Sequence, residues 1–213
     1  MAGCCDPEDY EGVFTGRLAR RVARRYSKRG LSPTAQRIVR FVQANGIDGA
    51  SVLEIGGGVG EIQLELLRLG AARVTNLEIS TNYEAEASRL LEDSRMADRV
   101  TRRFLDIARS PGQVDPADVV VLHRVVCCYP NYQALLSAAA SHAKRLLVYS
   151  HPDDNPVTRA SFWTENFLRS LRGNDFRAYI HPPEAMIAVA EREGLSTTYR
   201  HRSWKWEVVG LSR

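Results

Sequence analysis

Hydrophobic residues recur along most of the chain with two alternating periods, and this alternation predicts an α/β fold. Short β-branched runs predict strands, and the segments between them repeat their apolar residues every three to four positions, as helices do. The predicted strands cover residues 51–55, 73–77, 99–104, 118–122 and 145–149, with predicted helices at 59–69, 83–95 and 131–142. The run from Asp118 to Leu122 is apolar after its first residue, which is typical of a central parallel strand covered on both faces.

The last third of the chain departs from this regular alternation. A longer excursion after residue 149 contains a predicted helix at 157–171, and Pro182-Pro183 opens another at 184–193. Two closing strands at 196–202 and 204–211 follow, and we expect them to be antiparallel. The predicted fold class is therefore α/β, a doubly wound, mostly parallel, seven-stranded Rossmann-like sheet with an antiparallel C-terminal strand and an N-terminal helical arm.

The N-terminal arm has its own pattern. Residues 1–12 are acidic and lack periodicity, so we expect them to be flexible. Phe14, Leu18, Val22 and Tyr26 form an apolar stripe on an arginine-rich helix at 13–29, and a second helix runs from Pro33 towards Asn45. We divide the chain into an arm at 1–45 and a main domain at 46–213. Because an exposed apolar stripe needs a surface to cover, the arm is interpreted as a lid that orders over the site, with a contact for an acidic substrate and a permanently packed arm as the alternatives.

The densest chemical signal is the turn after the first predicted strand. Glu54 ends that strand, and Gly56, Gly58 and Gly60 follow at alternate positions before the helical pattern begins. Glycine allows a sharp turn and lets a ligand approach the bare backbone. The dinucleotide-binding fingerprint requires a third glycine three residues after the second, and Glu61 or Gln63 stands there instead. An acid at the strand end also suits a cationic ligand and would repel a pyrophosphate.

The sequence Glu54-x-Gly56-x-Gly58-x-Gly60 resembles motif I of the class I S-adenosylmethionine (SAM)-dependent methyltransferases. The resemblance covers residues 51–150 and implies that 46–213 is a SAM-dependent methyltransferase domain with SAM as its cofactor. Glu78 lies 22 residues after Gly56, where doubly wound folds place an acid that accepts from the ribose hydroxyls. The predicted contacts of the cofactor are Glu54, Gly56, Gly58, Gly60, Glu78, Ile79, Asp106, Ile107 and His123. Asp106 is similar in position to the family's acid after the third strand, which would accept from the adenine amino group.

A weaker likeness extends further along the chain. Tyr129-Pro130 before a helix, and Arg177 to His181 before another, are similar to the magnesium-protoporphyrin IX O-methyltransferases in order and rough spacing. The segment from Tyr149 to Pro156 and the N-terminal arm depart from that family. The likeness therefore implies a relative among the SAM-dependent methyltransferases of small molecules.

Polar residues after the fourth and fifth strands are the candidates for the acceptor side. His123, Tyr129 and His151 are predicted as the catalytic residues, because the carboxyl ends of parallel strands meet at the ligand-binding edge. Tyr179 and His181 are further candidates. A general base is needed only when the attacking atom carries a proton, and a carboxylate acceptor would need only positive groups to hold it.

Composition narrows the class of protein without naming a substrate. The formal net charge is +4, and 26 of the 29 basic residues are arginine, a bias typical of GC-rich bacterial genes. The cysteines form adjacent pairs, Cys4-Cys5 and Cys127-Cys128, which is not the spacing of a zinc site, so no metal is predicted. The chain lacks a run of 18 apolar residues and an apolar leader, so we expect a cytoplasmic protein without a membrane partner.

The function predicted from these patterns is transfer of a methyl group from SAM to an O, N, S or C atom of a small molecule. Nucleic acid is a less favoured partner, because the sequence lacks the Asn/Asp-Pro-Pro-aromatic motif of base-modifying enzymes. Two alternatives stay open: an RNA or protein methyltransferase that uses the arginine-rich helix, and a SAM-binding module without catalysis. A dehydrogenase is a less favoured alternative, because the third glycine of the dinucleotide-binding fingerprint is missing.

Overall fold

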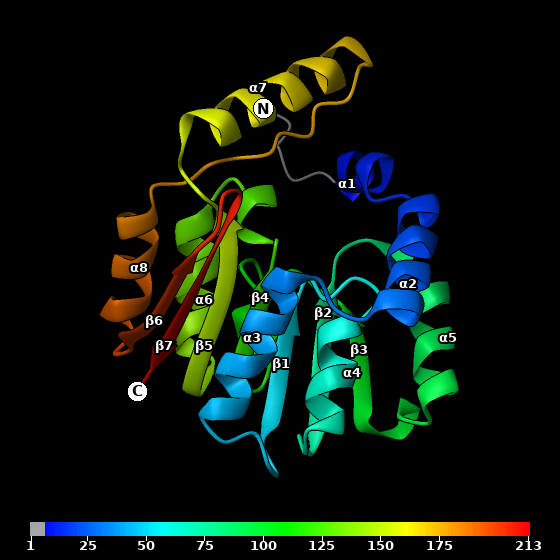
Figure 1. Ribbon diagram of the computed structural model, residues 1–213, viewed down its shortest axis with the longest axis vertical. Helices are drawn as coiled ribbons and strands as arrows, with labels where there is room; N and C mark the ends of the chain where they lie inside the picture. Colours follow the sequence, from blue (N-terminus) through cyan, green and yellow to red (C-terminus); the bar gives the residue numbers. More distant parts are fainter. Residues whose placement is uncertain (1–6) are drawn as a thin grey trace.

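A seven-stranded sheet runs through the centre of the molecule in the computed structural model, which describes residues 7–213 (Figure 1). The strands are β1 (Ser51–Ile55), β2 (Arg73–Glu78), β3 (Val100–Phe104), β4 (Ala117–His123), β5 (Ala143–Pro152), β6 (Ser196–Arg202) and β7 (Trp206–Ser212). Their order across the sheet is β3-β2-β1-β4-β5-β7-β6. The first five strands pair in parallel, whereas β7 is antiparallel to both β5 and β6. The predicted fold class is confirmed.

Helices cover both faces of this sheet. One face carries α3 (Pro33–Ala44) and α4 (Glu61–Arg68), and the other carries α6 (Tyr132–Ser141) and α8 (Pro183–Arg192). In β4, Val119 and Val121 belong to the first core and Val120 and Leu122 to the second, and all four side chains are fully buried. The uninterrupted apolar run in the sequence therefore reflects burial on both faces.

Three further helices lie at the carboxyl edge of the sheet. Two of them come from the N-terminus, α1 (Pro7–Val13) and α2 (Gly16–Arg29), and α2 packs against α5 (Glu84–Ser94). A third, α7 (Pro156–Leu171), lies across the top of the molecule in Figure 1. No helix among residues 7–213 is long and apolar enough to cross a membrane.

The structure differs from the sequence prediction at the N-terminus. Part of the segment expected to be flexible forms α1, and Thr15 begins α2 by accepting a hydrogen bond from the Leu18 amide, so the helix predicted at 13–29 begins three residues later, at Gly16. Tyr10 of α1 is buried, although the acidic composition of this segment favours exposure. Residues Cys4 and Cys5 lie outside the described part of the chain.

The predicted arm at 1–45 divides into two parts with different packing. Ile38 and Val42 of α3 are fully buried against the sheet, so α3 belongs to the core that it shares with β4 and β5. By contrast, Ala19, Ala23 and Tyr26 of α2 form a separate core with α4 and α5. Only α1 and α2 therefore lie in the position that a lid requires.

Candidate active site

A cavity of about 390 Å³ opens where β1, β2 and β4 end. Such a volume lies within the range of clefts that bind small molecules, about 300–1,000 Å³. One wall comes from the strand ends and the glycine turn, a second from α1 and α2, and a third from α7 and the turn between β6 and β7. The cavity thus lies at the sheet edge where doubly wound folds bind their ligands.

The glycine turn forms the floor of this cavity. Gly56, Gly58 and Gly60 adopt left-handed conformations with φ of 65°, 54° and 81°. A Cβ on Gly56 would lie 2.5 Å from a methyl group of Val125, so a side chain has no room there. Gly56 and Gly58 line the cavity, whereas Gly60 is the residue that begins α4 and does not line it. The turn leaves bare backbone exposed to a ligand, as its sequence predicts.

Three carboxylates gather around the turn: Glu54 at the end of β1, Glu61 at the start of α4 and Glu78 at the end of β2. Burial, together with the neighbouring Glu61, raises the pKa of Glu54 to about 8. Burial also raises the pKa of Glu61, and Arg124 and Arg25 partly oppose this shift. Concentrated negative charge in a buried wall favours a cationic ligand, because such a ligand relieves the cost of ionising these groups.

Glu78 organises the backbone around it. Its Oε2 accepts from the Gly58 amide at 2.9 Å, and its Oε1 accepts from the amides of Ile79 and Ser80 at 2.8 and 3.0 Å. Because a carboxylate has about four acceptor positions, one is left for a ligand hydroxyl. Glu78 and Ile79 both line the cavity, which is where the sequence predicts them.

Three positively charged side chains also line the cavity. Arg25 of α2, Arg124 after β4 and Lys205 between β6 and β7 all line it, and none of the three forms an ion pair within the described part of the chain. The Arg124 guanidinium lies 4.6 Å from the centroid of the Trp206 ring, a cation–π arrangement. The backbone of Arg124 has φ of 60°, an uncommon conformation for a residue with a side chain. These cations therefore line the cavity without an ion pair, although Arg25 and Arg124 are close enough to Glu61 to oppose part of the rise in its pKa.

His123 ends β4 and lines the cavity. Its Nδ1 is 2.9 Å from Ser150 Oγ, and that oxygen also accepts from the Arg124 amide. The Ser150 hydroxyl therefore links the His123 ring to the Arg124 backbone, and the direction of its hydrogen bond with Nδ1 depends on the tautomer of the ring. Burial, reinforced by Arg124, lowers the pKa of His123 to about 3. A histidine with this pKa is neutral at physiological pH and a weak proton acceptor.

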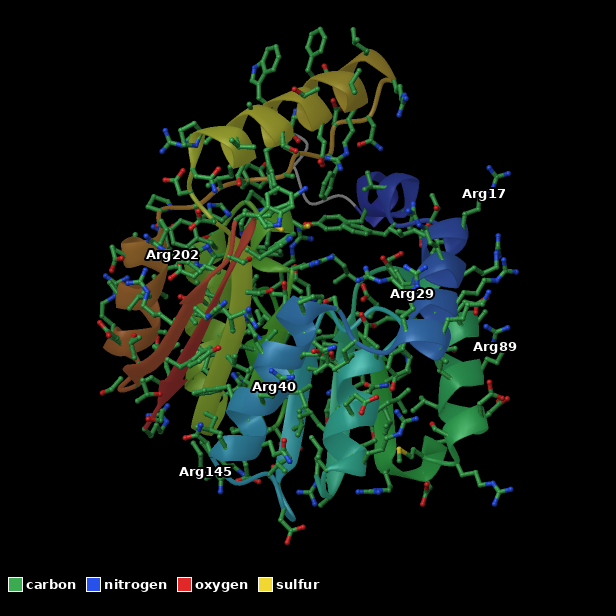
Figure 2. The ribbon with its side chains drawn as sticks, viewed as in Figure 1. Arg17, Arg29, Arg40, Arg89, Arg145 and Arg202 are labelled. Carbon is green, nitrogen blue, oxygen red and sulfur yellow. The ribbon has the colours of Figure 1, made fainter. Side chains whose placement is uncertain are left out.

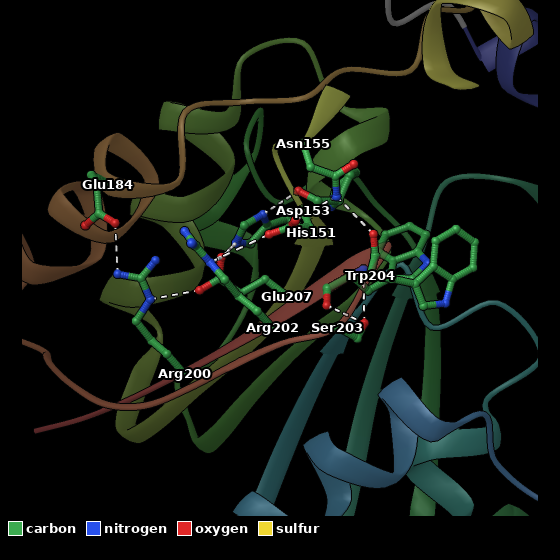
Figure 3. A network of polar contacts seen from close by, with 11 residues as sticks. His151, Asp153, Asn155, Glu184, Arg200, Arg202, Ser203, Trp204 and Glu207 are labelled. Atoms are coloured by element: carbon green, nitrogen blue, oxygen red, sulfur yellow. Dashed lines mark hydrogen bonds and ion pairs between the residues drawn. The ribbon is translucent and has the colours of Figure 1, made fainter. Parts of the chain in front are cut away.

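His151 does not line the cavity, although the sequence predicts it there. Figure 3 shows it within a polar network between β5 and β7. Its Nδ1–H donates to the Pro152 carbonyl at 2.9 Å, and its Nε2 is 3.6 Å from the Glu207 carboxylate. Glu207 in turn accepts from Arg200 and Arg202 at 2.8 and 3.2 Å. The contacts of His151 therefore stabilise strand pairing, and its catalytic role stays a sequence prediction without a contact to the cavity.

Tyr129, Asp106 and Ile107 also lie outside the cavity wall. Tyr129 is buried, and its hydroxyl donates to Asp106 Oδ2 at 2.8 Å. The other carboxylate oxygen of Asp106 accepts from the Ala108 amide, and Ile107 packs in the core with α6. The sequence places an acid correctly after β3, but in this structure its carboxylate holds Tyr129 in place.

The remaining candidates form a structural cluster beside the cavity. His181 Nε2 is 3.0 Å from the Tyr129 carbonyl, and its ring stacks on Tyr179 at 5.4 Å between centroids. Cys127 and Cys128 do line the cavity, with their sulfur atoms 3.6 Å apart. The Cys128 hydrogen bond and burial raise the pKa of Cys127 well above its usual value, which keeps its thiol protonated.

Sequence reasoning missed several residues that line the cavity. Glu61 follows the glycine turn directly, and an acid in the first turn of that helix is the signal that could have found it. Arg124 directly follows His123, which the sequence predicts as a site residue. Arg25 reaches the cavity from α2, and Lys205 and Trp206 reach it from the β6–β7 turn. No local sequence pattern predicts that these segments lie there.

Comparisons with known proteins agree with this geometry. The model of the methyltransferase domain family matches residues 20–207. A search of curated protein sequences gives no match. Among solved structures, the magnesium protoporphyrin IX methyltransferase of Synechocystis PCC 6803 with bound S-adenosylhomocysteine has a TM-score of 0.68 and 22% identity, covering 84% of this chain and 81% of that one.

Two other solved structures are similar to a comparable degree. The N-methyltransferase NodS of Bradyrhizobium japonicum WM9 has a TM-score of 0.62 at 14% identity, covering 84% of this chain and 85% of that one. A putative sarcosine dimethylglycine methyltransferase of Galdieria sulphuraria has a TM-score of 0.67 at 12% identity and covers 84% of each chain. These identities show a shared fold alone. The family match spans most of the sequence, so the chain belongs to the methyltransferase domain family and is a class I SAM-dependent methyltransferase.

Proposed function

We propose that this enzyme methylates a small molecule that combines an apolar body with an anionic group. The observation that carries the proposal is the set of three cations that line the cavity without an ion pair within the described residues, Arg25, Arg124 and Lys205, in addition to the carboxylates of Glu54, Glu61 and Glu78 around the glycine turn. Aromatic side chains line the same cavity, among them Phe14, Phe162, Phe176 and Trp206. An acidic acceptor with an apolar body matches this lining.

The residues around the turn fit the cofactor. Glu78 would accept from the ribose hydroxyls through its remaining acceptor position, and Glu54 and Glu61 would face the cationic amine. Gly56 and Gly58 would let the cofactor approach the backbone, because neither has a side chain. When bound, SAM supplies a methyl group activated by a positively charged sulfur. The finer assignment of Asp106, Ile107 and Gly60 as cofactor contacts stays a prediction from the sequence.

The acceptor side favours an atom that is already anionic. Neutral His123 is a weak base, and the protonated thiol of Cys127 is a weak nucleophile. An oxygen that carries its negative charge into the site needs no proton removed before it attacks. The cavity residues would then contribute mainly by positioning the two reactants and excluding water.

We expect SAM affinity to depend on the protonation of Glu54. The carboxyl is protonated below about pH 8 in the free protein, and a cationic ligand favours its charged form. Binding therefore releases a proton, so affinity rises as pH increases towards 8 and levels off above it. Calorimetry in buffers with different ionisation enthalpies measures the released proton directly. In Glu54→Gln the proton release should fall to what Glu61, whose pKa is also raised, contributes, and proton release unchanged in that variant would contradict the assignment.

We expect Arg124 and Lys205 to determine recognition of the acceptor. A panel of aromatic and alicyclic carboxylic acids, each paired with its amide, is assayed by transfer of the labelled methyl group of SAM. The acids should be preferred, and Arg124→Gln or Lys205→Gln should raise their KM by about 10- to 150-fold, the range for hydrogen bonds to charged groups. SAM affinity should change by no more than about threefold in these variants. The control Arg40→Gln, which replaces an exposed side chain of α3, should change the activity by no more than about threefold. Equal methylation of acids and amides by the unaltered enzyme would contradict the proposal.

A further inference from the structure

The helix α7 exposes its apolar side to solvent. Seven large hydrophobic residues are exposed among those the structure describes, and five of them lie on this helix: Val157, Trp163, Phe167, Leu168 and Leu171. Trp163 is 68% exposed and Leu171 69%. A sixth, Trp204, is 76% exposed, and its carbonyl accepts a hydrogen bond from Asn155, the residue that begins α7. The exposed hydrophobic residues are therefore concentrated at one end of the molecule, where Figure 1 shows α7.

The polar side of α7 faces the protein instead. Asn166 exchanges two hydrogen bonds with Ala178, at 2.8 and 2.9 Å, and Glu165 and Arg169 line the cavity. Phe162 is the one large apolar residue of the helix that is buried. A helix on the surface of a soluble domain normally has the opposite orientation, with its apolar stripe facing the core. The outward stripe of α7 is thus a surface that a partner would cover.

Positive charge accompanies this apolar surface. α2 forms another wall of the same cavity and carries seven exposed cations: Arg17, Arg20, Arg21, Arg24, Arg25, Lys28 and Arg29. Among residues 10–213, whose side chains the structure describes, none of them has an acidic partner within 4 Å, and α2 itself contains no acid. Arg17 extends from the body of the protein in Figure 2. Within α7, Glu165 is the one acid, and it is paired with Arg169 at 3.4 Å.

We propose that α7 and Trp204 insert into the head-group region of an anionic lipid membrane while the arginines of α2 contact its phosphates. An outward Trp/Phe/Leu stripe beside free arginines matches the chemistry of helices that lie in a membrane interface. Both helices border the cavity, so a bound membrane would lie close to it. The sequence prediction of no membrane partner rested on the absence of a membrane-spanning segment. A helix that lies in the membrane interface does not need one.

Two other partners fit the surface less well. Single-stranded RNA would use the arginines and could stack on Trp163, Phe167 and Trp204, but it offers nothing to the aliphatic Val157, Leu168 and Leu171. A second copy of the chain could cover the apolar stripe of α7, but it would bring a second set of unpaired arginines. The membrane is the partner that uses both the apolar and the cationic groups.

Sedimentation with lipid vesicles tests the proposal with the full chain. Vesicles of phosphatidylcholine alone are compared with vesicles that also contain phosphatidylglycerol, at about 0.1 M and about 1 M salt, where screening lengths are about 10 and 3 Å. We expect binding to the anionic vesicles that weakens at high salt. Trp163→Ser/Phe167→Ser/Leu171→Ser should lower the partition coefficient by at least about 100-fold, and Arg17→Gln/Arg20→Gln/Arg21→Gln by about 100-fold.

Matched controls separate the surface from general effects. Phe104→Ser removes an exposed aromatic residue away from α7, and Arg40→Gln/Arg73→Gln/Arg192→Gln removes three exposed arginines elsewhere; both should bind vesicles as the unaltered protein does. SAM affinity, measured in every variant, should be unchanged, which distinguishes failure here from failure of the proposed function. Three results would each overturn the proposal: no vesicle binding; vesicle binding that survives loss of the α7 stripe; or RNA binding or dimerisation that depends on this surface without vesicle binding.

Discussion

Replacing Glu78 with alanine is expected to weaken SAM binding by about 1.5–3 kcal/mol, the range for hydrogen bonds to a charged group. The structure adds a second expected effect. Because the carboxylate accepts from the amides of Gly58, Ile79 and Ser80, its loss leaves buried donors unsatisfied, so the free energy of unfolding should fall by about 1–3 kcal/mol. The sequence alone predicts a side chain that affects ligand binding with little effect on stability. Calorimetry and urea unfolding measure the two effects.

A control on the same side of the molecule is Glu92→Ala. Glu92 is exposed on α5, so its replacement should change neither SAM affinity nor stability by more than about 0.5 kcal/mol. If folded Glu78→Ala binds SAM as the unaltered enzyme does, Glu78 is not a cofactor contact. If its stability is unchanged, the three amide hydrogen bonds contribute less than their geometry implies.

Removal of residues 1–14 is expected to lower turnover by about 100-fold while SAM affinity changes by no more than about tenfold. The deletion removes three residues that line the cavity: Tyr10, Val13 and Phe14. The Tyr10 hydroxyl donates to the Cys128 carbonyl, and the Phe14 ring contacts Phe176 at 5.6 Å between centroids, so α1 connects the two sides of the cavity. Without it water reaches the reacting groups. Single-turnover kinetics with a saturating acceptor measures the effect.

The deletion ends before α2 because that helix contributes to the core. Ala19 and Ala23 are fully buried, and Tyr26 donates to Glu65 at 2.7 Å, so removing residues 1–29 would also expose α4 and α5. Phe14→Ala is a milder second variant that should lower turnover in the same direction. If the N-terminal segment is a lid, cleavage by trypsin at Arg17 should slow when SAM is added. Normal turnover after truncation, or cleavage indifferent to SAM, would identify α1 as a permanently packed helix.

The fold could be predicted because its main signals are local. The apolar run of β4, the glycine turn before α4 and the Ser32-Pro33 start of α3 each determine one element within a few residues. The longer β5 escaped prediction, since its last residues are stabilised by antiparallel pairing with β7. The α1 helix escaped for a similar reason: Tyr10 is buried by contacts with Phe176 and Cys128, which are far away in the sequence.

The candidate site could be predicted only where one strand end determines it. Glu54, Gly56, Gly58, Glu78, Ile79 and His123 line the cavity because each follows directly from the register of β1, β2 or β4. His151 also ends a strand, but β7 pairs beside it, and Glu207 closes that side. The cations come from α2, from the residue after β4 and from the β6–β7 turn. No single pattern in the sequence predicts that these three segments come together at the cavity.

Calorimetric titration of the full chain with SAM, with S-adenosylhomocysteine and with NAD tests the central claim most directly. The claim is that the acidic wall and the three-glycine turn form a SAM site. Glu54, Glu61 and Glu78 would attract the amine of both adenosyl ligands and repel the pyrophosphate of NAD. The account predicts saturable binding of both adenosyl compounds and no measurable binding of NAD. Tighter binding of NAD than of SAM would contradict it.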